Sequence, residues 1–152
     1  MAASAWQLYN EAKYYIGNGT ITLGAGVFKM VLLKSASNAS TFTLSTYAQL
    51  SAEVATAAGY VAGGRALVPA TGQWVQGASA KQQKFTMSAI GIAFTASGAN
   101  IADIKFAVIR NSTGTTAGKL LCWCKLSSSQ FTVATPNTLT VLPAATGIFT
   151  LT

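Results

Sequence analysis

The sequence predicts a mainly β protein: a single antiparallel β-sandwich or jelly-roll-like domain with an N-terminal α-helix. Three observations predict this fold: the chain length, a series of short strand-like segments, and a change of hydrophobic period after the first helix. At 152 residues the chain has the size of one domain and can bury a core of its own. We expect residues 1–19 to form a helix packed on or extending from the body, and residues 20–152 to form the sandwich.

The stretch from Ser4 to Gly19 carries the strongest helical signal. Ser4 followed by Gln7 matches a capping box, and Gly17-Asn18-Gly19 supplies residues that end a helix. At about 100° per residue the helix has one apolar stripe, made of Ala5, Leu8, Tyr9, Ala12, Tyr15 and Ile16. This stripe is expected to close the core of the subunit.

From Thr20 the apolar residues follow a period of two, which is typical of strands. Thr20–Leu23 and Val27–Lys34 read as a hairpin, Thr41–Leu44 as a short strand, and residues 59–68 as a turn leading into an edge strand ended by Pro69. An Ala-rich segment around 46–57 could hold a second short helix. The remaining strand candidates are GQWVQ, KQQKFTMSAIGIAFTA, DIKFAVIRN, KLLCWCKLS, QFTV, NTLTVL and GIFTLT. Short strands at this spacing, separated by turn residues, predict a sandwich or barrel.

Charged residues are sparse, at 9% of the chain against about 25% in a typical domain. We therefore expect other subunits to cover part of the surface, because obligate interfaces are depleted in charge. The net charge of +7 comes from ten basic and three acidic residues. The basic residues are scattered without a basic run, which disfavours nucleic acid as a partner, whereas an acidic protein surface suits the charge. No apolar stretch is long enough to predict a membrane span.

Cys122 and Cys124 form the pair that most resembles a chemical motif. On a strand they would share one face about 6.5–7 Å apart, too far for an unstrained disulfide. A zinc site would need two further ligands and an active thiolate would need a base, but the sequence has no His and no other Cys. We expect both thiols to pack in the core, on a face with Leu120 and Leu126.

The three acidic residues, Glu11, Glu53 and Asp103, fall in three separate elements. Their spacing does not suggest the paired carboxylates of acid–base catalysis. Together with the missing His, this predicts a protein without catalytic residues, metal or cofactor, and hence not an enzyme.

Aromatic and basic side chains supply the candidates for a partner interface: Trp6, Lys13, Tyr14, Trp74 and Trp123. Trp6 and Tyr14 lie outside the apolar stripe of the predicted helix, so they are free to contact a neighbouring molecule. Trp74 and Trp123 could instead stack on sugars, which keeps a host-glycan-binding module open as an alternative.

Several phrases, in order along the whole chain, carry a resemblance: WQLYNEAKYYIGNGTITL, VFKMVLLKSASNAS, LSTYAQLSAEV, AGYVAGGRAL, KFAVIRNSTG, KLLCWCKL and NTLTVLPAATGIFTLT. With these phrases the chain resembles small structural proteins of tailed double-stranded DNA bacteriophages. The resemblance implies a virion component, foremost a capsid decoration (cement) protein. Such proteins bind the major capsid protein on the outer shell as homo-oligomers, often trimers, and are assembled in the bacterial host cytoplasm. A tail component, such as a tube, terminator or tip subunit, is the alternative within the same family.

Overall fold

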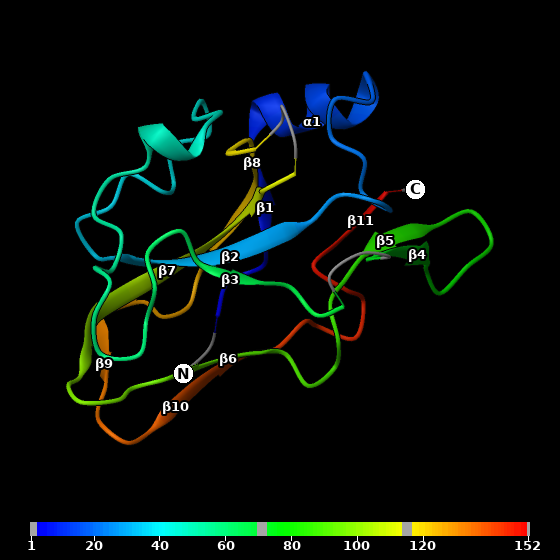
Figure 1. The fold of residues 1–152 in the computed structure, drawn as a ribbon. Helices are drawn as coiled ribbons and strands as arrows, with labels where there is room; N and C mark the ends of the chain where they lie inside the picture. The colour runs from blue at the N-terminus through cyan, green and yellow to red at the C-terminus, as the bar shows by residue number, and fades with distance from the viewer. Residues whose placement is uncertain (1–2, 70–72, 114–116, 152) are drawn as a thin grey trace.

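A computed structural model of the chain describes residues 3–69, 73–113 and 117–151, and these are mainly antiparallel β-structure (Figure 1). The predicted fold class, mainly β with an N-terminal helix, is confirmed, whereas a jelly-roll strand order stays a prediction. In chain order the elements are β1 (Gln7–Leu8), α1 (Asn10–Gly17), β2 (Phe28–Lys34), the 3₁₀ helix η1 (Tyr47–Gln49), β3 (Arg65–Ala66), β4 (Trp74–Gln76), β5 (Gln83–Phe85), β6 (Ile92–Thr95), β7 (Ile101–Asn111), β8 (Leu120–Lys125), β9 (Phe131–Val133), β10 (Thr138–Val141) and β11 (Phe149–Leu151).

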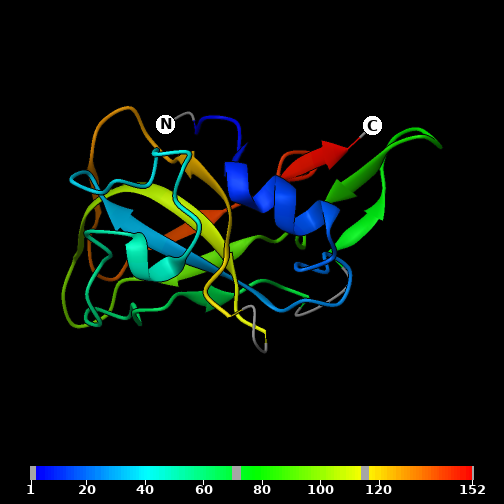
Figure 2. The ribbon, with the colours of Figure 1, turned by 90° about the horizontal axis from the view of Figure 1, so that it is seen from above.

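The main sheet has six strands, in the order β1-β8-β7-β2-β3, with β9 also paired to β7. Two smaller sheets accompany it, one made of β10 and β6 and the other in the order β11-β5-β4. Figure 1 shows α1 and η1 on one side of the main sheet and the β6–β10 pair on the other. The view from above places the β11-β5-β4 sheet beyond one end of the main sheet (Figure 2). The result is a layered, sandwich-like body.

The centre of the main sheet is buried on both faces, and this explains its uninterrupted apolar sequences. Side chains along a strand alternate between the two faces, yet consecutive residues are buried in β2 (Met30–Leu33), β7 (Phe106–Ile109) and β8 (Leu120–Cys124). Strands covered on both sides read as continuous apolar runs. The predicted core face of β8 is therefore correct but incomplete, because the opposite face of that strand is covered as well.

The predicted start of the first helix at Ser4 is wrong. The helix begins at Asn10, and the residues before it run extended along β8, where Gln7 and Leu8 form β1. The Ser4 N–H donates to Lys125 O (2.8 Å), and the Lys125 N–H donates to Ser4 Oγ (2.9 Å). Backbone pairing with β8 thus takes precedence over the local capping pattern. The predicted C-terminal end is confirmed, since α1 ends at Gly17 with Asn18 as its C-cap.

The expected second helix around residues 46–57 is reduced to the single turn of η1. Gln49 and Thr46 do form a capping box, but Leu50 is already extended, Ala52 has a φ of +55°, and Glu53 bridges to Leu33 of the main sheet. Pairing with the sheet therefore overrides the helical propensity of the Ala-rich stretch.

Two of the predicted strands are turns in the structure. In the segment 20–23 the Ile21 N–H donates to Tyr15 O (2.9 Å), and Thr22 O accepts from the Gly26 N–H (2.8 Å), so no hairpin forms there. Residues 41–44 close a turn in which the Leu44 N–H donates to Thr41 O (3.2 Å). The edge strand expected before Pro69 is confirmed as β3.

Candidate functional site

The two cysteines of β8 lie in the core with both thiols buried. Cys122 pairs in register with Ile109 and Cys124 with Ala107, so the two thiols share one face of the sheet, as predicted. Burial raises the pKa of Cys124 to about 12. The pKa of Cys122 lies well above its usual value, chiefly because the thiol is buried and also because Cys124 lies nearby. Protonated, enclosed thiols are packing groups and not nucleophiles.

We expect the folded protein to react with Ellman's reagent at pH 8 on the order of 100-fold more slowly than free cysteine does, because the thiolate is scarce and enclosed. The control is the same protein unfolded in guanidinium chloride, in which both cysteines should react at once. If one thiol of the folded protein reacted at the rate of free cysteine, Cys122 or Cys124 would be accessible and the described packing would be wrong.

A polar cluster lies where the 45–64 segment crosses the main sheet. We call it the Glu53 cluster; its members are Tyr47, Glu53, Tyr60, Gly63 and Arg110. The hydroxyls of Tyr47 and Tyr60 both donate to the Glu53 carboxylate, and the bond from Tyr60 is 2.7 Å long. The Gly63 N–H donates to the same carboxylate at 2.7 Å. The Arg110 guanidinium lies 4.4 Å from the centre of the Tyr47 ring and donates to Gly63 O at 2.8 Å. These contacts fasten the segment to the sheet.

The surroundings of the two tyrosines favour their neutral forms. Burial, followed by the hydrogen bond to Glu53, raises the pKa of Tyr47 to about 12. The same two causes, in the same order, raise the pKa of Tyr60 above its usual range. The Tyr60 hydroxyl also accepts a hydrogen bond from the Leu32 N–H (3.1 Å), so it joins the segment to β2 directly.

The acidic residues do not assemble into a reactive group. Glu53 is held by its three donors, Glu11 is exposed in the first turn of α1, and Asp103 lies in β7. In the described part of the chain, no group of three or more His, Cys, Asp or Glu residues could hold a metal ion.

Two of the predicted interface residues lie on the outer face of α1. Lys13 and Tyr14 are exposed, and Tyr14 is the more prominent, with 64% of its surface accessible. The neighbouring Tyr15 instead turns toward the sheet, where its hydroxyl accepts a hydrogen bond from Lys119 Nζ (3.2 Å). The opposite side of the helix is anchored by Ala12, which is fully buried.

Two further predicted interface residues, Trp6 and Trp74, are half-buried and line hollows. Trp6 lies in the extended N-terminal segment rather than on a helix, beside a hollow of about 440 Å³ shared with residues 142–149. Trp74 on β4 packs its ring 6.4 Å from that of Phe149 and lines a hollow of about 310 Å³ with Ile16. The structure thus places Trp74 near the helix that carries Lys13 and Tyr14.

Trp123, the fifth predicted interface residue, lies in the interior and is only 7% exposed. Its ring makes edge-to-face contacts with Phe42 and Phe106, at centroid distances of 5.7 and 6.3 Å. In this position it is unavailable for stacking on a sugar. The sequence held a signal for this burial: Trp123 is flanked by Leu121, Cys122 and Cys124, and such an apolar run is typical of a strand covered on both faces.

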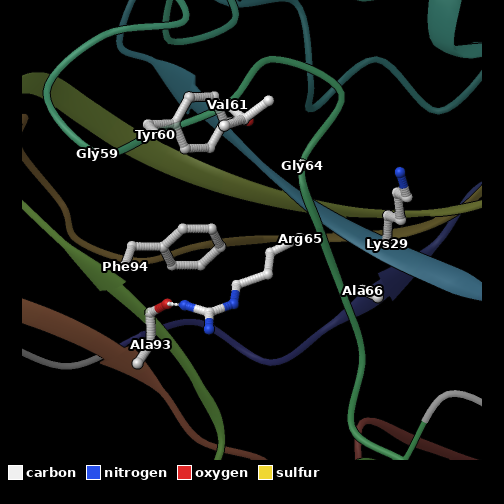
Figure 3. A pocket seen from close by; sticks show the side chains of 9 residues that line it. All are labelled: Lys29, Gly59, Tyr60, Val61, Gly64, Arg65, Ala66, Ala93 and Phe94. Carbon is white, nitrogen blue, oxygen red and sulfur yellow. Dashed lines mark hydrogen bonds between the residues drawn. The ribbon is translucent and has the colours of Figure 1, made fainter.

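A slot between two strand edges is the feature that the sequence did not predict. It has a volume of about 410 Å³ and lies between β3 of the main sheet and β6 of the smaller sheet (Figure 3). Its lining residues are Lys29, Gly59, Tyr60, Val61, Gly64, Arg65, Ala66, Ala93 and Phe94. Figure 3 shows Arg65 reaching across the slot to the carbonyl of Ala93, a hydrogen bond of 2.5 Å.

No family model, curated protein or solved structure matched this chain. Within the described residues, no helix is long and apolar enough to cross a membrane.

The slot could not be recognised from local patterns, because its two sides come from segments about thirty positions apart. The one local signal was Gly63-Gly64 before Arg65, which reads as a turn into an edge strand. That signal predicts the strand but does not identify the edge that faces it.

Proposed function

We propose that this chain is a structural protein of a tailed bacteriophage virion, a capsid decoration protein that binds the major capsid protein on the outer shell. The resemblance along the whole sequence is the observation that carries the proposal. Three of its phrases supply β2, β7 and β8, which are neighbouring strands of the main sheet. Four members of the Glu53 cluster lie in LSTYAQLSAEV and AGYVAGGRAL, and Arg110 lies in KFAVIRNSTG. The resemblance thus rests on residues that build the framework.

The surface gives independent support, because large apolar side chains are exposed on a chain with few charges. Tyr14, Val61, Ile90 and Leu142 are 64%, 66%, 75% and 57% exposed. The low charge of this surface suits lasting contacts with other subunits, because obligate interfaces are depleted in charge. This supports a homo-oligomer, for which the resemblance favours a trimer.

A decoration protein stabilises a shell by contacting adjoining capsomers at the same time. An oligomer on a symmetry axis makes several weak contacts together, and effective concentration turns them into firm attachment. The net charge of +7 would add electrostatic attraction to an acidic shell surface.

Virions assembled with and without this protein provide the test. We expect particles without it to release their DNA at lower temperature or lower salt than complete particles, and we expect mass spectrometry to find hundreds of copies per complete virion. A Tyr14→Ala variant should bind particles more weakly while its free energy of unfolding stays within about 0.5 kcal/mol of the parent, because the side chain is exposed. Lys81→Ala, an exposed substitution away from α1, is the matched control.

Particles that survive heat and low salt equally well without the protein would contradict the decoration role. A fixed low copy number, in rings at the tail, would instead assign the chain to the tail. If the protein were absent from virions, the proposal as a whole would fail.

A further inference from the structure

The slot beside Arg65 is formed by two chain segments that run antiparallel, are tied at both ends and are separated in the middle. At one end the Ser97 N–H donates to Ala58 O (3.0 Å), and at the other the Ser88 N–H donates to Val68 O (2.6 Å). Between these ties lie β3 and β6, each with its own partner strand on the far side. The gap is therefore built into the fold, with backbone hydrogen bonds fixing both of its ends.

Backbone groups of Ala66 and Ala93 point into this gap. In antiparallel pairs, residues alternate between those that bond to the partner strand and those that point away from it. Leu67 bonds to its partner strand β2, because its N–H donates to Phe28 O, and Ala96 bonds toward the strand β10 side, because its N–H donates to Asn137 O. Ala66 lies one residue before Leu67, and Ala93 lies three residues before Ala96, so by the alternation both point away from those partners and into the gap. The bond from Arg65 Nη1 to Ala93 O agrees with this direction for β6.

Positive charge accompanies these backbone groups. The Arg65 guanidinium has five N–H donors, of which one bonds to Ala93 O, and no acidic residue is among the described residues that line the slot. Lys29 lies beside it, with its amine pointing away from the guanidinium in Figure 3. The forked cation is suited to a carboxylate, the outward N–H and C=O groups are suited to the backbone of an extended segment, and a wall that includes Val61 is suited to its apolar side chains.

We propose that the slot binds an acidic side chain presented by an extended segment of another protein. The Arg65 guanidinium would bind the carboxylate and the outward backbone groups of Ala66 and Ala93 would bind the backbone of the segment, while Val61 contacts the apolar neighbours of the acidic residue. Identifying this partner as the capsid shell protein rests on the proposed function; the binding chemistry does not.

A second copy of the chain fits the slot poorly. The sequence has only three acidic residues, and they lie in the folded body: Glu53 is bound in its cluster, Glu11 lies on helix α1 and Asp103 lies within the paired strand β7. Nucleic acid fits poorly as well, because Tyr60 and Phe94 are 2% and 4% exposed and so offer no ring face on which a base could stack.

The binding is tested by NMR titration of the ¹⁵N-labelled protein with the peptide acetyl-Val-Glu-Val-amide. We expect the amide signals of Ala66 and Ala93 to shift. Acetyl-Val-Gln-Val-amide, sodium acetate and the oligonucleotide (dT)8, at equal concentration, are the comparison ligands and should shift these signals far less. Arg65→Gln should weaken binding at least tenfold, Arg65→Lys should weaken it less because the charge remains, and Lys81→Gln should leave it unchanged.

Val61→Asp is a second variant that does not depend on altering Arg65. Val61 is 66% exposed, so the substitution should be tolerated, and its carboxylate should compete for Arg65 and weaken binding at least tenfold. The proposal is overturned if the two amides do not shift, if the Gln peptide, acetate or (dT)8 shifts them equally, or if Arg65→Gln binds like the parent.

The slot and the proposed function can fail separately. If virions carry hundreds of copies of the protein but the slot does not bind the acidic peptide, the decoration role stands and this binding site is rejected. If the slot binds the peptide but the protein is absent from virions, the binding site stands and the decoration role is rejected.

Discussion

Replacing Glu53 with glutamine is expected to lower the free energy of unfolding by about 3 kcal/mol. The carboxylate accepts hydrogen bonds from two tyrosine hydroxyls and from the Gly63 N–H. A neutral amide has one acceptor oxygen and turns a donor toward groups that are themselves donors. Bonds to a charged group contribute about 1.5–3 kcal/mol, and half-satisfied networks lose more than one bond. Urea denaturation, monitored by tryptophan fluorescence, measures this loss of unfolding free energy.

Glu11→Gln is the matched control, because it makes the same chemical change at an exposed position in the first turn of α1. It should cost only a few tenths of a kcal/mol, the usual scale of a charge at a helix N-terminus. Tyr47→Phe and Tyr60→Phe should each cost about 1 kcal/mol, and less when combined with Glu53→Gln, because the substitutions remove shared bonds. Equal losses for Glu11→Gln and Glu53→Gln would mean that the cluster does not hold the 45–64 segment.

The same cluster makes the fold sensitive to alkali. The pKa of Tyr47 is raised to about 12 and that of Tyr60 is raised as well, so the folded state keeps protons that the unfolded chain releases near pH 10. The stability that these two tyrosines contribute is therefore full below pH 10 and is lost as the pH rises toward 12, while the raised pKa values of Cys122 and Cys124 add a fall that begins near their ordinary value of 9.0. In Glu53→Gln the slope over this range should be shallower, because a hydrogen-bond acceptor and a negative charge that raise both pKa values are gone.

The parts of the fold that the sequence predicted well are those in which local pattern and tertiary context agree. The phrases FKMVLLK, FAVIRN and LLCWC are apolar runs of β-forming residues, and they became the centre of the main sheet. The end of α1 was predicted because Gly17-Asn18-Gly19 stops a helix whatever surrounds it.

The failures arose where pairing with a distant strand overrides local preference. Ser4 has the chemistry of a helix cap, but its hydroxyl accepts from the backbone of Lys125, which lies 121 positions away. The Ala-rich segment has helical propensity, but Glu53 bridges to Leu33. The slot belongs to the same class, since Arg65 and Ala93 meet only because β3 and β6 are edges of different sheets. No local pattern encodes such a meeting.

Gly64→Ala should be among the most damaging single substitutions in the chain, with a loss of about 4 kcal/mol. Gly64 has a φ of +82°, a conformation that costs other residues on the order of 1 kcal/mol. An added Cβ would also overlap Met30 O and would lie 2.6 Å from Val31 Cγ1. These atoms belong to β2 at the centre of the main sheet, so β3 would have to move away. Thermal denaturation should show a fall in Tm of about 10 °C.

Gly98→Ala separates backbone strain from this close approach. Gly98 has a similar φ of +74°, but nothing lies within 4 Å of the position that its Cβ would take, so the loss should stay near 1 kcal/mol and the fall in Tm near 3 °C. If both variants lost a similar amount of unfolding free energy, backbone strain alone would account for the loss, and the close approach of β3 to Met30 would not matter. If the approach matters, Gly64→Ala should also lose the peptide response of the slot, because Arg65 follows directly and is positioned by it. Gly98→Ala should keep that response, which makes the pair a test of how the edge of the sheet sets the geometry of the site.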